Sequence, residues 1–116
     1  ADVIFEVIGG DVFDQSLRCI NMFGRILVLG FASGRIADAP TNLPLLKNSA
    51  VIGSFLGGWM KRDPAAFIEM NEAIVKLLGD SGLRVPIART FKMADGAEAM
   101  EILLCRDTVG KIMLRP

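Results

Sequence analysis

The stretch RILVLGFASGR, residues 25–35, decides how the rest of the chain is interpreted. Its apolar run, Ile26 to Leu29, predicts a strand that is buried on both faces, as in a parallel sheet covered by helices. Gly30 and Gly34 bracket the loop that follows. In an open α/β sheet, ligands bind at the carboxyl ends of the strands. The stretch therefore favours either a loop against which a flat ligand can lie or a strand that only turns over.

Two other apolar runs resemble this one, because each is followed by a pair of glycines. Residues 3–8 precede Gly9-Gly10, and residues 49–55 precede Gly57-Gly58. If the three strands are parallel neighbours, their three glycine-rich loops face one crevice, where the apolar rings and amide of a nucleotide could lie against backbone. Gly53, inside the third run, predicts a bulge or the close approach of another backbone.

The segment between the first two runs has the spacing of an amphipathic helix. Phe13, Leu17 and Ile20 form one apolar face. We expect Asp11 to cap the start of this helix and Gly24 to end it in a left-handed conformation. Strand, helix and strand then form one parallel, right-handed unit.

A second helix is predicted to begin at Asp63-Pro64, a capping residue followed by proline at the first helical position. It runs to about Gly79. Its apolar residues keep a spacing of three to four, which favours core packing; they are Phe67, Met70, Ile74 and Leu77.

After residue 82 a different pattern follows. Residues 87–92 and 111–115 are predicted strands, and a short helix from Gly96 to about Leu104 separates them. Asp95 and Glu98 have the spacing of a capping box.

Composition limits what the chain can be. Its 116 residues allow one modest core, and 13 basic residues balance 13 acidic ones. This neutrality gives no electrostatic argument for nucleic acid or an anionic membrane, and no apolar run approaches the roughly 20 residues that span a bilayer. No signal peptide precedes the first strand. Cys19 and Cys105 are interpreted as small core residues, without a disulfide or a zinc site.

Several chemical motifs are missing. The chain has no histidine, so it has no Ser–His or Cys–His pair, and no GxGxxG phosphate loop opens a helix. Asp11 and Asp14 are interpreted as helix-capping residues in preference to a catalytic carboxylate pair. The absent initiator Met and the immediate first strand suggest a piece of a longer protein that runs to its C-terminus.

A family resemblance becomes specific over residues 9–55, which read GGDVFDQSLRCINMFGRILVLGFASGRIADAPTNLPLLKNSAVIGSF, with VGK at 109–111 and LRP at 114–116. The chain resembles the C-terminal part of the medium-chain dehydrogenase/reductase superfamily, and within it the zinc-independent NADPH:quinone oxidoreductases. The resemblance implies an α/β fold, with the second half of a Rossmann doubly wound parallel sheet in residues 1–82. Residues 83–116 would be a C-terminal strand–helix–strand segment of the catalytic, GroES-like domain. The phosphate loop would lie upstream of Ala1.

The resemblance also implies a cofactor site. The end of the first strand would lie near the nicotinamide ribose, the second loop along the nicotinamide, and the third against the carboxamide through backbone groups. The residues implied are Val7, Gly9, Leu29, Gly30, Phe31, Ala32, Ser33, Gly34, Ser54, Phe55, Leu56 and, from the last turn, Thr108. No catalytic residue and no metal ligand can be named.

The implied activity is hydride transfer from NADPH to a quinone or a related conjugated carbonyl, in a cytoplasmic homodimer joined through the strand around Val51–Phe55. Neither nucleic acid nor a membrane is expected as a partner. Three alternatives stay open: an enoyl thioester reductase or zinc alcohol dehydrogenase of the same superfamily, a non-catalytic nucleotide-binding or structural module, and half of another doubly wound domain such as a methyltransferase. NADH in place of NADPH also stays open.

Overall fold

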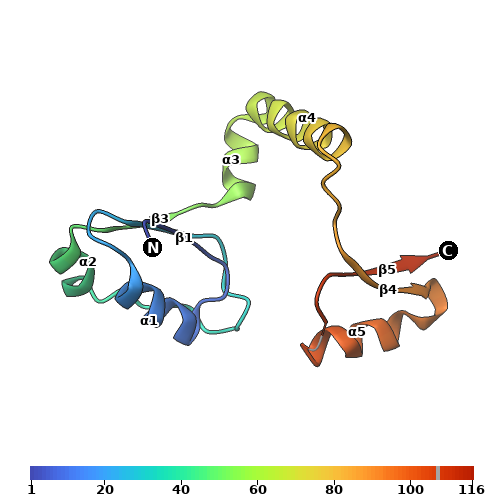
Figure 1. Ribbon diagram of the computed structural model, residues 1–116, viewed down its shortest axis with the longest axis horizontal. Coiled ribbons are helices and arrows are strands. Elements are labelled where there is room, and N and C mark those ends of the chain that lie inside the picture. Colours follow the sequence, from blue (N-terminus) through green and yellow to red (C-terminus); the bar gives the residue numbers. More distant parts are fainter. Residues whose placement is uncertain (107) are drawn as a thin grey trace. The chain divides into compact units, whose positions relative to one another are not determined.

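The computed structural model describes residues 1–106 and 108–116. It divides into two compact units, Ala1–Phe67 and Ile68–Pro116, which are described in turn (Figure 1). The division falls inside a helix. The boundary predicted between residues 82 and 83 concerns the domains of a longer protein, and it stays a prediction.

The first unit is built on a three-stranded parallel sheet in the order β1-β2-β3. Its elements are β1 (Val3–Glu6), α1 (Gly10–Cys19), β2 (Arg25–Val28), α2 (Asn42–Lys47), β3 (Ala50–Gly53) and α3 (Leu56–Arg62). The register aligns Glu6 with Val28 and Val28 with Gly53, so the three strands end at one level. The prediction of parallel neighbours with their following loops at one edge is confirmed.

Each strand is shorter than predicted. The predicted runs 3–8, 25–30 and 49–55 contain ladders of four residues each. The residues that leave the ladder, among them Val7, Leu29 and Ser54, begin the loops at the carboxyl edge. The predicted bulge at Gly53 is wrong, because β3 pairs with β2 in regular register.

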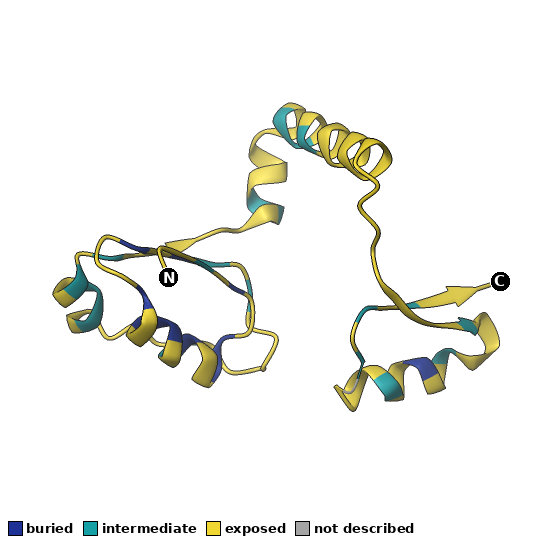
Figure 2. Ribbon diagram, in the orientation of Figure 1, coloured by how far each residue is buried: buried dark blue, intermediate teal, exposed yellow. Residues whose placement is uncertain are grey.

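The core of the first unit lies on one face of the sheet, where α1 packs Phe13, Leu17 and Ile20 against Ile26 (Figure 2). The predicted apolar face of α1 is confirmed. The prediction that β2 is buried on both faces is wrong. Leu27 is only half-buried, and its register partner Phe5 is 71% exposed on the same open face. Within this unit α1 covers a single face.

The predicted ends of α1 also need correction. Asp11 lies inside the helix; the N-cap residue is Gly9, and no side chain caps the helix there. The left-handed residue after the helix is Phe23, with φ 63°, and Gly24 is not left-handed. A Cβ at Gly24 would lie 2.5 Å from Cγ1 of Ile20. Gly24 is thus required by close packing, not by backbone conformation.

The second unit contains a second parallel strand–helix–strand motif. The unit begins within α4 (Pro64–Asp80). The motif follows, and consists of β4 (Ile87–Lys92), the 3₁₀ turn η1 (Met93–Asp95), α5 (Gly96–Leu104) and β5 (Lys111–Arg115). Strands β4 and β5 pair in parallel, with an irregularity between Ile87 and Arg89. The strands and the helix predicted after residue 82 are confirmed.

Two predicted caps have different outcomes. The start of α4 is confirmed, because Asp63 Oδ1 accepts a hydrogen bond from the Ala66 amide at 3.0 Å. The capping box of Asp95 and Glu98 is wrong. Asp95 occupies the N-cap position of α5 but makes no side-chain cap bond, since η1 runs directly into the helix.

The predicted burial along α4 is seen only in part. Phe67 and Met70 are half-buried, whereas Ile74 and Leu77 are exposed, Leu77 at 56%. In the described part of the second unit, Ala99 is the one buried residue. Cys19 and Cys105 are exposed free thiols, which corrects their interpretation as core residues. No helix in the described residues is long and apolar enough to cross a membrane.

Candidate functional site

The carboxyl edge of the three-stranded sheet gathers every predicted cofactor-binding residue except Thr108. Val7 and Gly9 follow β1, residues 29–34 follow β2, and residues 54–56 follow β3. Because the strands end in register, these segments meet at one side of the sheet. This is the position at which open α/β sheets bind their ligands.

The first two loops are joined by backbone hydrogen bonds that continue the pairing of the strands. The amide of Leu29 donates to the carbonyl of Glu6 at 2.8 Å, that of Ala32 to Val7 at 3.0 Å, and that of Ser33 to Ile8 at 2.8 Å. The two loops therefore behave as one hydrogen-bonded layer, and a movement of one displaces the other.

The glycine pair Gly9-Gly10 serves this layer. Gly9 has φ 71°, and a Cβ on it would lie 2.7 Å from the carbonyl oxygen of Arg35 and 2.9 Å from Cδ1 of Phe31. The pair thus allows the second loop to pack on the first. Gly9 is buried under the second loop, and its place in the cofactor site stays a prediction.

The third glycine pair is also placed differently from the prediction. Gly57 and Gly58 lie within α3, not in a loop after β3. A Cβ at Gly58 would lie 2.7 Å from Cδ1 of Phe55, so these glycines accommodate the aromatic ring. Gly30 and Gly53 do lie open: a Cβ at Gly30 would be 3.7 Å from the Val7 carbonyl oxygen, and one at Gly53 would meet nothing within 4 Å.

A hollow of about 200 Å³ lies between the ends of β2 and β3. Its lining is largely apolar side chains and glycine backbone, contributed by Val28, Leu29, Gly30, Phe31, Gly53, Ser54 and Phe55. This volume suits one aromatic or heterocyclic ring, not a whole dinucleotide, because ligand pockets for larger molecules span about 300–1,000 Å³. The open Cβ positions of Gly30 and Gly53 fit a flat group that approaches the backbone.

The backbone amides of the site are not all available to a ligand. Those of Leu29, Ala32 and Ser33 join the two loops, the Gly34 amide donates to Phe31, and the Ser54 amide donates to Val28 at 2.9 Å. A hydrogen-bonding ligand at this edge would therefore use carbonyl oxygens or the amides of residues 30, 31, 55 and 56. The predicted backbone contacts of Ser54, Phe55 and Leu56 with the carboxamide could use the Ser54 amide only if this sheet bond opened.

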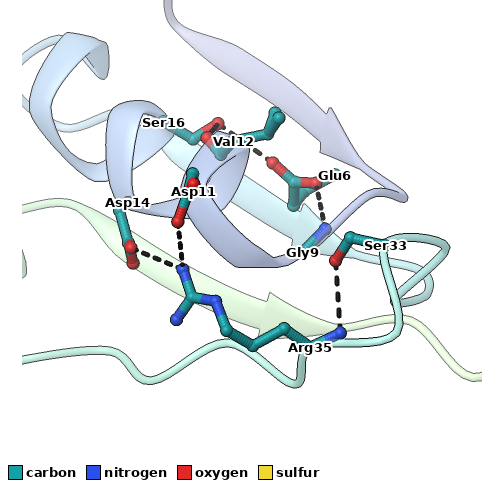
Figure 3. Close-up of polar contacts among 8 residues, drawn as sticks. All are labelled: Glu6, Gly9, Asp11, Val12, Asp14, Ser16, Ser33 and Arg35. Atoms are coloured by element: carbon teal, nitrogen blue, oxygen red, sulfur yellow. Dashed lines mark hydrogen bonds and ion pairs between the residues drawn. The ribbon is translucent and has the colours of Figure 1, made fainter.

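Glu6, the buried carboxylate at the end of β1, was not among the residues predicted from the sequence. Its side chain is 2% exposed. Oε1 accepts a hydrogen bond from the Ile8 amide at 2.8 Å. It also accepts one from the Gly9 amide at 2.9 Å, and Oε2 accepts one from Ser16 Oγ at 3.0 Å (Figure 3). Burial raises the pKa of this carboxyl, but the three hydrogen bonds lower it more, so the net pKa is below the ordinary value. The available signal was one charged residue within an apolar strand.

An outer layer of charged groups holds the far end of the second loop. The Arg35 guanidinium contacts Asp11 Oδ1 at 2.9 Å and Asp14 Oδ2 at 2.7 Å, and Ser33 Oγ accepts from the Arg35 amide (Figure 3). The hydrogen bond to Asp14, and secondarily the contact with Asp11, raises the pKa of Arg35. Asp11 and Asp14 are thus ion-pair partners of a loop arginine, and their interpretation as capping residues is wrong.

Thr108 belongs to the second unit. There it lines a hollow of about 230 Å³ with Ala88, Arg89, Ile102, Cys105 and Val109. Its hydroxyl remains a predicted cofactor contact. Among the described residues, no group of three or more His, Cys, Asp or Glu side chains could hold a metal ion.

Comparison with known proteins gives a consistent answer. Residues 1–114 match the family model described as zinc-binding dehydrogenase. The chain is 36% identical over 115 residues to the quinone oxidoreductase-like protein 2 homolog of Nematostella vectensis, and 34% identical over 113 residues to quinone oxidoreductase-like protein 2 of Mus musculus. These alignments cover 98% and 97% of the chain, but 32% of each relative. The chain thus spans about a third of the length of these curated relatives.

Solved structures show the same fold at lower identity. The quinone oxidoreductase of Pseudomonas syringae pv. Tomato matches all of the chain with a TM-score of 0.82 and 23% identity, over 36% of that protein. A mycobacterial protein complexed with NADPH matches all of the chain with a TM-score of 0.85 and 20% identity, over 35% of that protein. Both place the arrangement of strands and helices seen here within larger proteins.

Proposed function

The chain belongs to the zinc-binding dehydrogenase family of the medium-chain dehydrogenase/reductase superfamily, and from this we propose that it forms the C-terminal third of an NADPH-dependent, zinc-independent reductase of quinones or related conjugated carbonyls. The supporting observation is the carboxyl edge of the parallel sheet. There, the loop after β2 and the end of β3 line an apolar hollow with open glycine backbone. The names of its curated relatives support quinone reduction in the parent protein.

The residues present fit the nicotinamide end of the cofactor. The rings of Phe31 and Phe55 are exposed beside the hollow, and Gly30 and Gly53 leave backbone accessible to a planar group. NADPH, when bound, supplies the hydride. This chain would bind and orient the nicotinamide between the β2 and β3 loops and would exclude water with the apolar lining. No proton donor is assigned to it.

The direct test is turnover by the full-length protein with NADPH and a small quinone, followed by the loss of reduced-nicotinamide absorbance. We expect activity that survives dialysis against a zinc chelator and that falls when NADH replaces NADPH. Activity lost with zinc would favour the zinc alcohol dehydrogenase. Tight NADPH binding without turnover of a quinone or an enoyl thioester would favour the non-catalytic module, and turnover of the thioester alone would favour the enoyl reductase.

The 116-residue chain by itself should bind NADPH weakly or not at all, because it has no GxGxxG loop for the pyrophosphate. Isothermal titration of the isolated chain and of the full-length protein compares the two directly. Tight binding by the isolated chain would contradict this division of the cofactor site.

We also propose a cytoplasmic homodimer joined through β3. This strand lies at the edge of the sheet, and Val51 and Ile52 on it are exposed. An apolar edge strand pairs readily with another chain unless it is covered. Light scattering of the full-length protein should give twice the monomer mass, and Ile52→Lys should shift the mass toward the monomer. A wild-type monomer would overturn the proposed interface.

A further inference from the structure

Glu6 is the last residue of β1, and its side chain folds into the turn between β1 and α1, where it binds the backbone amides of that turn. Oε1 lies 2.9 Å from the Gly9 amide nitrogen (Figure 3) and 2.8 Å from that of Ile8, so one carboxylate oxygen satisfies two successive backbone donors. Gly9 is held at φ 71°. Without this acceptor, the amides of Ile8 and of the buried Gly9 would lack a hydrogen-bond partner, which costs free energy away from water.

The second oxygen of Glu6 fastens this turn to the helix behind it. Ser16 Oγ lies 3.0 Å from Oε2 and 2.9 Å from the carbonyl oxygen of Val12, one helical turn earlier. A hydroxyl has one proton to donate, so these two acceptors share it. Because Ser16 lies among the buried residues of α1, the carboxylate connects the turn to the helix that forms the core of the unit.

The β1–α1 turn is hydrogen-bonded to the loop that follows β2. The carbonyl oxygens of Val7 and Ile8 accept from Ala32 and Ser33, and the carbonyl oxygen of Glu6 itself accepts from Leu29. The side chain of Glu6 fixes the direction of the first two carbonyl groups, because it binds the amides of the same turn. One buried side chain therefore determines the course of two loops.

We propose that Glu6 is a positioning residue for the nicotinamide end of the cofactor. It acts through residues 7–9 and 29–33, and with 2% of its surface exposed it does not touch the cofactor. Ser16 supports it from α1. This inference rests on the proposed function, in which the same two loops bind the nicotinamide and its ribose. It adds a residue that the family resemblance does not supply.

Three variants of the full-length protein separate positioning from general stability. In Glu6→Gln the amide oxygen still accepts from both backbone amides, and its NH₂ group donates to Ser16 Oγ, which can then donate to Val12. Glu6→Leu has a similar volume but no acceptor. Ser16→Ala removes the bond from the helix to Glu6, together with the bond to the Val12 carbonyl oxygen, and leaves the two backbone amides bonded. Glu98→Leu on α5 is the control for the loss of an exposed carboxylate.

The readout is the ratio of two affinities measured by calorimetry, one for NADPH and one for 2′,5′-ADP, which lacks the nicotinamide and its ribose. We expect Glu6→Leu to weaken NADPH binding about tenfold or more, as for the loss of hydrogen bonds to a charged group, and to change 2′,5′-ADP binding less than about twofold. Ser16→Ala should weaken NADPH binding about threefold, again without affecting 2′,5′-ADP. Glu6→Gln and Glu98→Leu should match the wild type for both ligands.

Three results would overturn the positioning role alone: equal losses for both ligands, no loss in a folded Glu6→Leu or Ser16→Ala protein, or a loss in Glu6→Gln as large as in Glu6→Leu. If Glu6→Leu does not fold, the ratio in Ser16→Ala decides. Failure of the wild-type protein to bind either ligand is distinguishable from these three results. It would overturn the proposed function, and the positioning role with it.

Discussion

Within residues 1–106 and 108–116 the same motif occurs twice, and one copy builds a core of large apolar side chains while the other does not. β1-α1-β2 in the first unit and β4-α5-β5 in the second are both parallel strands joined through a helix. In the first, α1 buries Phe13, Leu17 and Ile20. In the second, α5 buries Ala99 and leaves Leu104 77% exposed. Topology alone therefore does not stabilise a strand–helix–strand motif.

The two helices bury different amounts of apolar side chain because the sheets on which they pack differ in size. α1 lies on a sheet with a third strand, and Ile4, Val28, Ala37 and Leu43 pack around its buried residues. α5 faces only the pair β4 and β5. A two-stranded sheet is marginal in water and presents too narrow a face to bury large side chains. The residue that α5 does bury is accordingly small.

The largest expected effect tests this contrast with the same substitution in both helices. Leu17→Ala should cost about 2–5 kcal/mol of the free energy of unfolding, because it opens a cavity in a closed core. Leu104→Ala should change it by less than about 0.5 kcal/mol, as for an exposed site. Urea unfolding followed by circular dichroism measures both. Equal losses would show that the second unit has a core of comparable strength.

The next effect sharpens the comparison at the glycines. Gly9 and Gly110 both have positive φ, and a Cβ would lie 2.7 Å from the Arg35 carbonyl oxygen at the first and 2.8 Å from the Pro86 carbonyl oxygen at the second. Gly34 and Gly82 also have positive φ but nothing within 4 Å. They are therefore controls for backbone strain alone, one in each unit.

We expect Gly34→Ala and Gly82→Ala to cost about 1 kcal/mol each, and Gly9→Ala about 2 kcal/mol more than Gly34→Ala. The excess for Gly110→Ala over Gly82→Ala should be smaller, because fewer buried contacts oppose its relaxation. Urea midpoints of the four variants decide the order. An excess at Gly110 as large as that at Gly9 would mean that both units resist displacement equally.

The sequence predicted the periodic features of the fold. Spacing predicted the apolar face of α1, the parallel strands and the two strand–helix–strand motifs. Local chemistry predicted the start of α4 at Asp63-Pro64. The prediction failed at positions that depend on where an element begins and on residues far away in the chain. Asp11 has the right chemistry for a cap, but α1 begins one residue earlier, so Asp11 lies inside the helix and its carboxylate pairs with Arg35.

The candidate site divides in the same way. That three loops share one edge was predictable, because parallel strands in register end together. The functions of the glycines were not, since Gly9 is fixed by contacts with Arg35 and Phe31, more than twenty residues away. Glu6 was missed because a lone glutamate in a strand resembles a surface residue until the amides of Ile8 and Gly9 turn inward to meet it.

The pH dependence of stability should separate wild type from Glu6→Gln. The pKa of Glu6 is lowered in the folded state, because its three hydrogen bonds outweigh the opposing effect of burial. The stability it contributes is therefore complete above its unfolded pKa, and it is lost as the pH falls through the folded value. Unfolding midpoints from neutral pH down to acid should fall more steeply for wild type than for the Gln variant. Parallel curves would contradict a lowered pKa.

The smallest expected effect concerns the outer layer of charge, where the first unit has a visible ion-pair cluster and gains little from it. Arg35 is half-exposed, and its two contacts with Asp11 and Asp14 lie in solvent, where water and salt screen them. Arg35→Gln should lower stability only slightly at low salt, and the difference should vanish at high salt. A double-mutant cycle with Asp14→Asn isolates the closer pair, and Arg115→Gln in the second unit is the control for loss of a positive charge. A coupling energy that persisted at high salt would mean that the ion pairs of Arg35 fix the second loop as firmly as Glu6 does. The proposed difference between the buried Glu6 contacts and the solvent-screened Arg35 contacts would then be wrong.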